Sequence, residues 1–139
     1  MFRKLVVVVL AFACTVVAAP AADARQDPMT GAWSGTDVDG STLHVTIGGG
    51  EHRLVFQDDG ATVCLTAFGE FTKASGSAFG QISGNRLEAT MDLYCHLSSG
   101  KTLWMSHLQV EYEYDPASDT MIDQTGQCFH RPSSASDCP

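Results

Sequence analysis

The chain has 139 residues, of which 44% are hydrophobic and 17% are charged, and its formal net charge is −8. This length suits one domain. The excess of carboxylates repels nucleic-acid phosphates and anionic lipid head groups, so we expect neither nucleic acid nor a membrane surface as a partner.

The N-terminal segment has the pattern of a secretory signal peptide. Arg3 and Lys4 precede an uncharged apolar run, and an A-x-A pattern ends at Ala24. The run is shorter than the roughly 20 residues that a membrane-spanning helix needs. Lipid attachment at Cys14 is the alternative, but the bulky Phe12 stands where a small residue is expected. We therefore predict cleavage after Ala24 and a secreted or periplasmic protein.

A first hairpin is predicted over residues 30–47. Its second half alternates polar residues with three aliphatic ones, Leu43, Val45 and Ile47. Alternation of period 2 places these three on one face, as in a half-buried antiparallel strand. Asp39-Gly40 predicts a two-residue turn between the strands, because glycine tolerates the positive φ that such a turn demands.

Further strands are predicted along the rest of the chain, at residues 51–57, 61–65, 78–82, 86–95, 104–114, 120–123 and 127–131. Asp58-Asp59-Gly60 predicts a turn between the first two of these. Alternation is clearest over 86–95, where every second residue from Leu87 to Cys95 is apolar or small. The segment 66–77 shows no pattern and is predicted to be a loop.

The predicted fold is all-β, because no segment after the signal peptide has a sustained apolar period of 3.6 residues. Helices are therefore expected to be absent or one turn long. An antiparallel meander of about eight strands forms either a sandwich or a small up-and-down barrel. We favour the barrel, since sequential hairpins close it without long crossings and closure removes exposed edges. The predicted organisation is a signal peptide at 1–24, a barrel domain at 30–131 and a tail at 132–139.

Four cysteines follow the signal peptide, namely Cys64, Cys95, Cys128 and Cys138. An even number in a small exported domain predicts two disulfides, for which three pairings are possible. We favour Cys64 with Cys95 and Cys128 with Cys138, because the second pair closes a short loop and fixes the Ser- and Pro-rich tail. The spacings contain no CxxC and match no zinc site, so neither a metal nor a redox role is expected.

One short motif resembles a known superfamily. Gly31-Ala32-Trp33 on the first strand, together with Arg131 at the end of the last, resembles the G-x-W and late-Arg pairing of the calycins, the lipocalin-like and avidin-like barrels. The resemblance implies that Arg131 stacks over Trp33 where the barrel closes. A longer pattern, carried by residues 37–41 and 114–120, is similar to small exported bacterial proteins of uncharacterised function. It implies a fold and a compartment, and no activity.

Several aromatic residues are candidates for a ligand site. Trp104, Tyr112 and Tyr114 share the inner parity of their predicted strand, so they could line a ligand cavity or fill the core. Phe68 and Phe71 lie in the predicted loop and could form a lid at the barrel mouth or a buried plug.

Catalytic and metal-binding patterns are weak. Asp37, Asp39 and Ser41 resemble part of a calcium loop, but the glutamate that would complete it is missing, so turn chemistry is the favoured interpretation. The five histidines show no ligand spacing, and there is no GxSxG motif. We therefore predict no enzyme, no cofactor and no metal.

Two functions follow as expectations. The first is a non-catalytic binding module that takes a small apolar ligand at the barrel mouth, near Phe68, Phe71, Trp104 and Tyr112. The alternative is a rigid envelope or protein-interaction module, inhibitor-like, with no ligand in the lumen. In either case we expect a monomer.

Overall fold

The computed structural model describes residues 27–48, 51–133 and 138. The predicted signal peptide at 1–24 and most of the tail lie outside these residues. The described part of the chain forms the following elements: β1 (Gly31–Thr36), β2 (Thr42–Ile47), β3 (Arg53–Ala61), α1 (Thr62–Phe68), β4 (Thr72–Phe79), β5 (Gln81–Ser83), β6 (Arg86–His96), β7 (Thr102–Asp115), β8 (Thr120–Asp123) and β9 (Cys128–His130). Among them, no helix combines the length and the apolar character needed to cross a bilayer.

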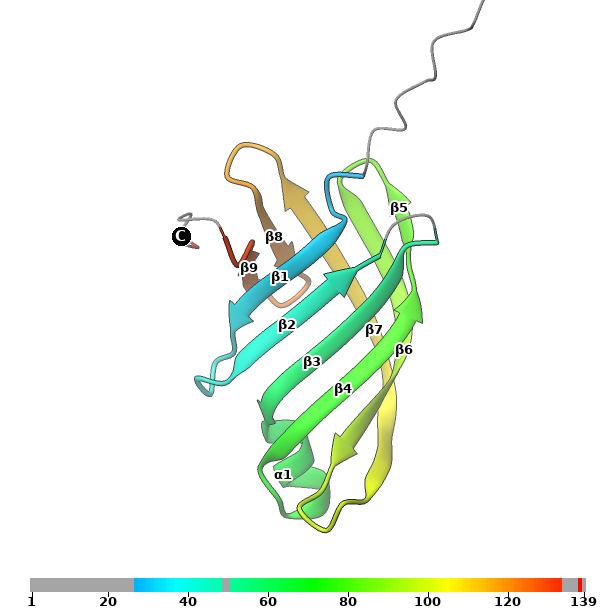
Figure 1. Cartoon of the computed structure of the whole chain (residues 1–139), viewed down its shortest axis with the longest axis vertical. Helices are drawn as coiled ribbons and strands as arrows, with labels where there is room; N and C mark the ends of the chain where they lie inside the picture. Colours follow the sequence, from blue (N-terminus) through cyan, green and yellow to red (C-terminus); the bar gives the residue numbers. More distant parts are fainter. Residues whose placement is uncertain (1–26, 49–50, 134–137, 139) are drawn as a thin grey trace, which may run out of the picture.

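The strands form one antiparallel barrel (Figure 1). Each strand pairs with the next along the chain except β4 with β5, both of which pair with β6, and β9 pairs with β1. The short β5 follows β4 along the same edge of β6, so nine strands make an eight-stranded wall. The predicted up-and-down meander barrel is therefore confirmed.

Three hairpins share one turn, which differs from the predicted two-residue turn. In the first, the Asp37 N–H donates to the Ser41 carbonyl and the Gly40 N–H donates to the Asp37 carbonyl, each over 2.9 Å. Gly40 has a φ of 87°. This is a three-residue loop that ends in a left-handed residue. The same bonds recur over 97–101 and 123–127, each with a glycine at the fourth position.

Two clusters of buried side chains fill the barrel. The upper cluster contains large residues from most strands, including Trp33, Val45, Leu87, Tyr112 and Phe129. The lower cluster, next to α1, is built from Ala61, Cys64, Ala74, Leu93 and Cys95. The predicted inward alternation in β2 and β6 is confirmed, because those residues are buried or half-buried.

The segment predicted as a strand at 61–65 is instead the helix α1, and this prediction was wrong. Cys64 and Phe68 are four residues apart and both contact the lower cluster, as one face of a helix requires. Gly69 ends the helix with a φ of 75°, and its N–H donates to the Leu65 carbonyl over 2.9 Å. Seven residues are too few for the apolar period to be recognised.

Two neighbouring boundaries also differ from the prediction. The expected turn at 58–60 lies within β3, where the pairing with β4 shifts between Asp58 and Ala61. The expected loop at 66–77 contains the start of β4 at Thr72. Both differences follow from α1, which replaces a hairpin turn as the connection between β3 and β4.

Candidate functional site

The four residues predicted to bind a ligand lie in different surroundings. Tyr112 is 2% exposed in the upper cluster, and its ring meets Phe129 edge-on at 5.5 Å. Phe68 is half-buried against the lower cluster. Phe71 and Trp104 are 55% and 53% exposed. These residues therefore do not line one common site.

The predicted contact at the barrel closure is present. The Arg131 guanidinium carbon lies 3.8 Å from the centroid of the Trp33 ring, and Arg131 Nη1 donates to the Thr30 carbonyl over 2.8 Å. The Trp33 indole N–H donates to the Met29 carbonyl over 2.8 Å. Gly31 makes room for this contact, because a Cβ there would lie 2.5 Å from Arg131 Nη1. These contacts join the N-terminal and C-terminal parts of the barrel domain, and they leave Trp33 buried.

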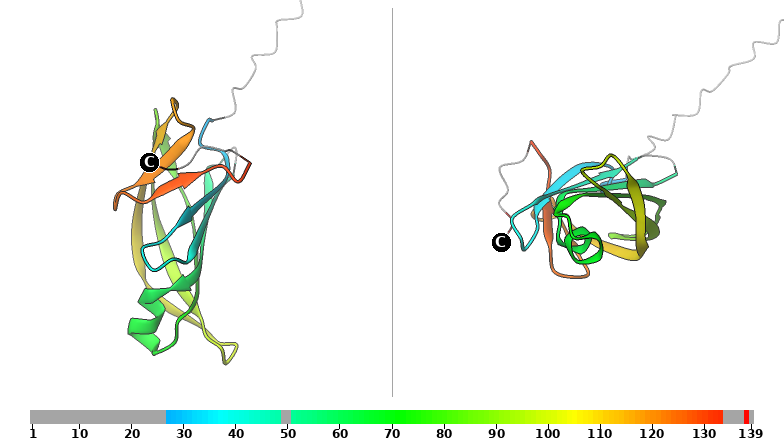
Figure 2. Two further views of the ribbon diagram at one scale, coloured as in Figure 1. Left: turned by 90° about the vertical axis from the view of Figure 1, so that its left-hand side faces the viewer. Right: turned by 90° about the horizontal axis from the view of Figure 1, so that it is seen from below.

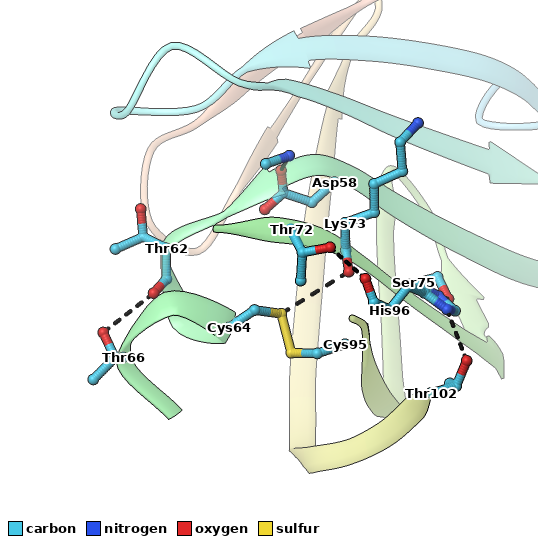
Figure 3. The surroundings of a disulfide bond; sticks show 11 residues. Asp58, Thr62, Cys64, Thr66, Thr72, Lys73, Ser75, Cys95, His96 and Thr102 are labelled. Atoms are coloured by element: carbon cyan, nitrogen blue, oxygen red, sulfur yellow. Dashed lines mark hydrogen bonds between the residues drawn. A yellow bond between two sulfur atoms is a disulfide. The ribbon is translucent and has the colours of Figure 1, made fainter. Parts of the chain in front are cut away.

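Both predicted disulfides are present. Cys64–Cys95 joins α1 to β6 and is buried in the lower cluster (Figure 3), and Cys128–Cys138 joins β9 to the tail. A disulfide typically stabilises a small domain by about 2–4 kcal/mol. Two such bonds favour an oxidising, extracytoplasmic compartment.

Trp104 lies on the outer face of β7, and its predicted inward orientation was wrong. In the pairing of β6 with β7, Leu93 lies opposite Ser106 but Tyr94 lies opposite Trp104, so Met105 is an extra residue. Such a bulge reverses the alternation of side chains beyond it. The period-2 rule applied from Tyr112 therefore fails below Ser106.

The exposed indole of Trp104 is held in place by polar contacts. Its Nε1–H donates to Asp92 Oδ1 over 3.0 Å, and the same oxygen lies 2.7 Å from His107 Nδ1. The Trp104 and His107 rings meet edge-on at 5.5 Å. Tyr94, 37% exposed, lies opposite Trp104 on β6. Together Tyr94, Asp92, Trp104 and His107 form an ordered polar and aromatic surface, which we call the Trp104 patch.

A shallow groove adjoins the Trp104 patch on the outer faces of β3, β4 and β6. It has a volume of about 380 Å³ and is lined by Arg53, Val55, Gln57, Ser75, Gly76, Ser77, Asp92 and Tyr94. Ser75 pairs with Gln57 and Tyr94, and the short serine side chain between two longer ones leaves the depression. Farther along the same faces, Phe79 is 66% exposed. Three of the exposed aromatic residues of the described chain thus gather on this side of the barrel.

The opposite edge of β7 is open over its lower half. The pairing of β7 with β6 begins at Thr102, whereas the pairing with β8 covers only Tyr112–Asp115. Figures 1 and 2 show β8 and β9 beside the end of β7 that is far from α1. Among the described residues, no strand pairs with Thr102–Leu108 on this side. Within the described part of the chain, this edge of β7 therefore has no strand partner.

The side chains of a serine, a histidine and an aspartate also form a row of contacts across three neighbouring strands on the surface. Ser34 Oγ lies 3.3 Å from His44 Nδ1, and His44 Nε2 lies 3.5 Å from Asp59 Oδ2. The Asp59 carboxylate is shared with Lys73 over 2.9 Å, and its hydrogen bond from Lys73 is the main cause of its lowered pKa. These long contacts lie on open strand faces. They are typical of cross-strand contacts rather than of an activated nucleophile, which needs a close base.

In the β1–β2 turn, which the sequence offered as part of a calcium loop, the Asp39 carboxylate accepts hydrogen bonds from other residues of the protein. Asp39 Oδ1 accepts from the Ser41 N–H over 2.9 Å and Asp39 Oδ2 accepts from Thr62 Oγ1 over 2.5 Å. The described residues contain no cluster of three metal-ligating side chains. The contact with Thr62 instead ties the β1–β2 turn to the start of α1.

Among the described residues, Asp58 is the only buried carboxylate, and its exposed fraction is 6%. Its Oδ1 accepts from Ser41 Oγ and from the Gly60 N–H, each over 2.9 Å. Burial raises its pKa more than these hydrogen bonds lower it. Asp58 therefore fixes the junction of β3 and α1.

Comparison with known proteins adds no relative. The chain matches no protein-family model, no curated protein and no solved structure. The fold and the site define an eight-stranded antiparallel barrel with two disulfides, an ordered aromatic patch and an open strand edge. Because one barrel fold serves many unrelated functions, the function has to be argued from this surface.

Proposed function

We propose that the protein is a non-catalytic, extracytoplasmic protein-binding module and that its partner contacts the Trp104 patch. The observation that carries this proposal is an exposed tryptophan held by two neighbours, Asp92 and His107. Tryptophan is enriched among residues that dominate binding energy. A side chain fixed before binding loses little conformational entropy when the partner arrives.

The groove beside the Trp104 patch supports a protein partner. It is shallow, and Arg53 and Gln57 line it on β3 while Tyr94 lines it on β6. An apolar centre surrounded by polar groups is the usual composition of a protein interface. Small-molecule sites, in contrast, are usually enclosed and mainly apolar.

A small apolar ligand inside the barrel is the second proposal. The lower cluster favours it, because Ala61 and Ala74 present short side chains near the half-buried Phe68. Native mass spectrometry of protein purified from its host would reveal a retained small molecule. A calycin-like relationship is also proposed, and the contact of Arg131 with Trp33 supports it.

The test compares two aromatic residues of equal exposure. Phe71 is 55% exposed, and its ring packs on Gly60. A Cβ added at Gly60 would lie only 2.6 Å from this ring. The mature, disulfide-bonded protein would be immobilised and exposed to the extracytoplasmic fraction of its host. We expect Trp104→Ala to weaken capture of the partner by about tenfold or more, since hot-spot residues contribute at least about 2 kcal/mol.

Phe71→Ala is the matched control and should leave capture unchanged. Trp104→Phe should recover part of the binding, because it keeps an aromatic ring but loses the hydrogen bond to Asp92. Equal capture by the wild type and Trp104→Ala would contradict the proposal.

A further inference from the structure

The open edge of β7 indicates how a partner would dock. We propose that an extended, basic segment of another protein adds as a strand to Thr102–Leu108 and continues the sheet beside β7. This inference rests on the proposed function, since it specifies the binding mode at the same surface. Strand addition to an exposed edge is a recurrent mode of peptide recognition.

The protein already makes such bonds at the upper end of this edge. The Glu111 N–H donates to Gln124 Oε1 over 2.9 Å, and Gln124 Nε2 donates to the Gln109 carbonyl over 3.1 Å. The side-chain amide of Gln124 thus occupies the place of a peptide group in a neighbouring strand. Its geometry shows that this edge accepts and donates hydrogen bonds of strand type.

The next free backbone groups belong to His107. Alternate residues of an antiparallel strand direct their N–H and C=O to the same side. The Glu111 N–H and the Gln109 carbonyl face the β8 side. The N–H and C=O of His107 therefore face the same open side, whereas those of Leu108 face β6.

Side chains on both faces of β7 also match an added strand. Leu103, Met105 and Leu108 are only half-buried on the inner face, and Trp104 is exposed on the outer face. A strand beside them would cover both sets with alternating residues. We expect apolar side chains on its inward positions.

The sequence of this edge lacks the residues that usually protect one. Proline, lysine and inward charges discourage pairing at natural edges. Thr102–Leu108 contains none of them, and its one protective feature is the bulge at Met105. Because the bulge interrupts the regular backbone, an added strand can pair with only a few residues on each side of Met105.

Charge decides between the possible occupants. The chain after residue 24 has six basic and fifteen acidic side chains, so two copies repel each other. Asp123, which lies opposite Tyr112 at the upper limit of the opening, adds a carboxylate there. Complementarity therefore favours a partner segment with basic residues on its outward positions.

The test uses a synthetic peptide in which valine and lysine alternate over about nine residues, a length within the usual range of strands. Binding to the mature, disulfide-bonded protein would be measured by calorimetry. We expect His107→Pro to weaken binding by about tenfold or more, because it removes the edge-facing N–H and places the ring against the peptide. His107→Ala loses the same side-chain contacts with Asp92 and Trp104 but keeps the N–H, so it should bind the peptide about tenfold or more tightly than His107→Pro does. A valine-glutamate peptide of equal length should not bind.

A second measurement keeps the test valid if His107→Pro does not fold. Addition of the valine-lysine peptide to the wild type should slow hydrogen exchange of the His107 amide by about tenfold or more, since an amide must open before it exchanges. Absence of binding, binding that His107→Pro leaves unchanged, or an amide that stays unprotected would each overturn strand addition. If the wild type forms dimers and His107→Pro is monomeric, the edge binds a second copy of the chain, and the proposal of a basic partner segment is overturned.

The two proposals can fail separately. If the captured protein depends on Trp104 but not on the His107 N–H, the partner docks on the outer face alone and only strand addition is overturned. If capture depends on neither, the proposed function fails as well.

Discussion

The two ends of the barrel are built on different principles. At the end with β8 and β9, all strands pair and the core contains Trp33, Tyr112 and Phe129. At the end with α1, the buried core is smaller and contains two alanines, Leu93 and a disulfide, and β7 keeps an open edge. The first end is stabilised by packing and by the pairing of β8 and β9 with β7 and β1. The second end relies on a covalent bond, so it can remain incomplete and available to a partner.

The largest expected effect lies in the aromatic core of the upper end. Phe129 is 1% exposed and meets the Tyr112 ring edge-on at 5.5 Å. Phe129→Ala should lower the free energy of unfolding by about 3–5 kcal/mol, because it removes buried apolar area and leaves a cavity. Urea unfolding followed by circular dichroism, with both disulfides intact, would measure the loss. A loss below about 1 kcal/mol would show that packing does not hold this end.

Removal of the lower disulfide should have the next largest effect. The double variant Cys64→Ala, Cys95→Ala should lose about 2–4 kcal/mol of unfolding free energy. Hydrogen exchange should increase in α1 and in the lower half of β6, while the upper strands remain protected. Uniform loss of protection over the whole barrel would contradict the division into two ends.

The smallest effect should be the pH dependence of Asp58. Its raised pKa means that the folded state favours the protonated form, so its contribution to stability is present at low pH and is lost as the pH rises through the folded pKa. Asp58→Asn keeps an acceptor for Ser41 and Gly60 and cannot ionise. The variant should therefore gain stability relative to the wild type between acidic and neutral pH. A difference that does not change with pH would contradict this account of Asp58.

The sequence predicted the parts that depend on local patterns. Alternation identified the inner faces of β2 and β6, and the disulfide pairs followed from cysteine number and loop length. The contact of Arg131 with Trp33 followed from a short resemblance.

The parts that sequence reasoning missed depend on pairing between distant strands. The orientation of Trp104 is set by the register of β7 against β6, and a single extra residue at Met105 reverses it. The open edge depends on where the pairing of β8 with β7 ends, at Asp123 opposite Tyr112. The helix α1 had one local signal, the glycine at 69, which favours a helix end as well as a turn.

The central claim is that the open edge of β7 binds a partner, and hydrogen exchange of two adjacent amides tests it most directly. In the free protein, the His107 amide should exchange fast and the Leu108 amide, which faces β6, should exchange slowly. With the partner bound, the His107 amide should slow by about tenfold or more while the Leu108 amide changes little. A His107 amide that is already protected in the free protein, or that exchanges equally fast in the complex, would contradict the claim.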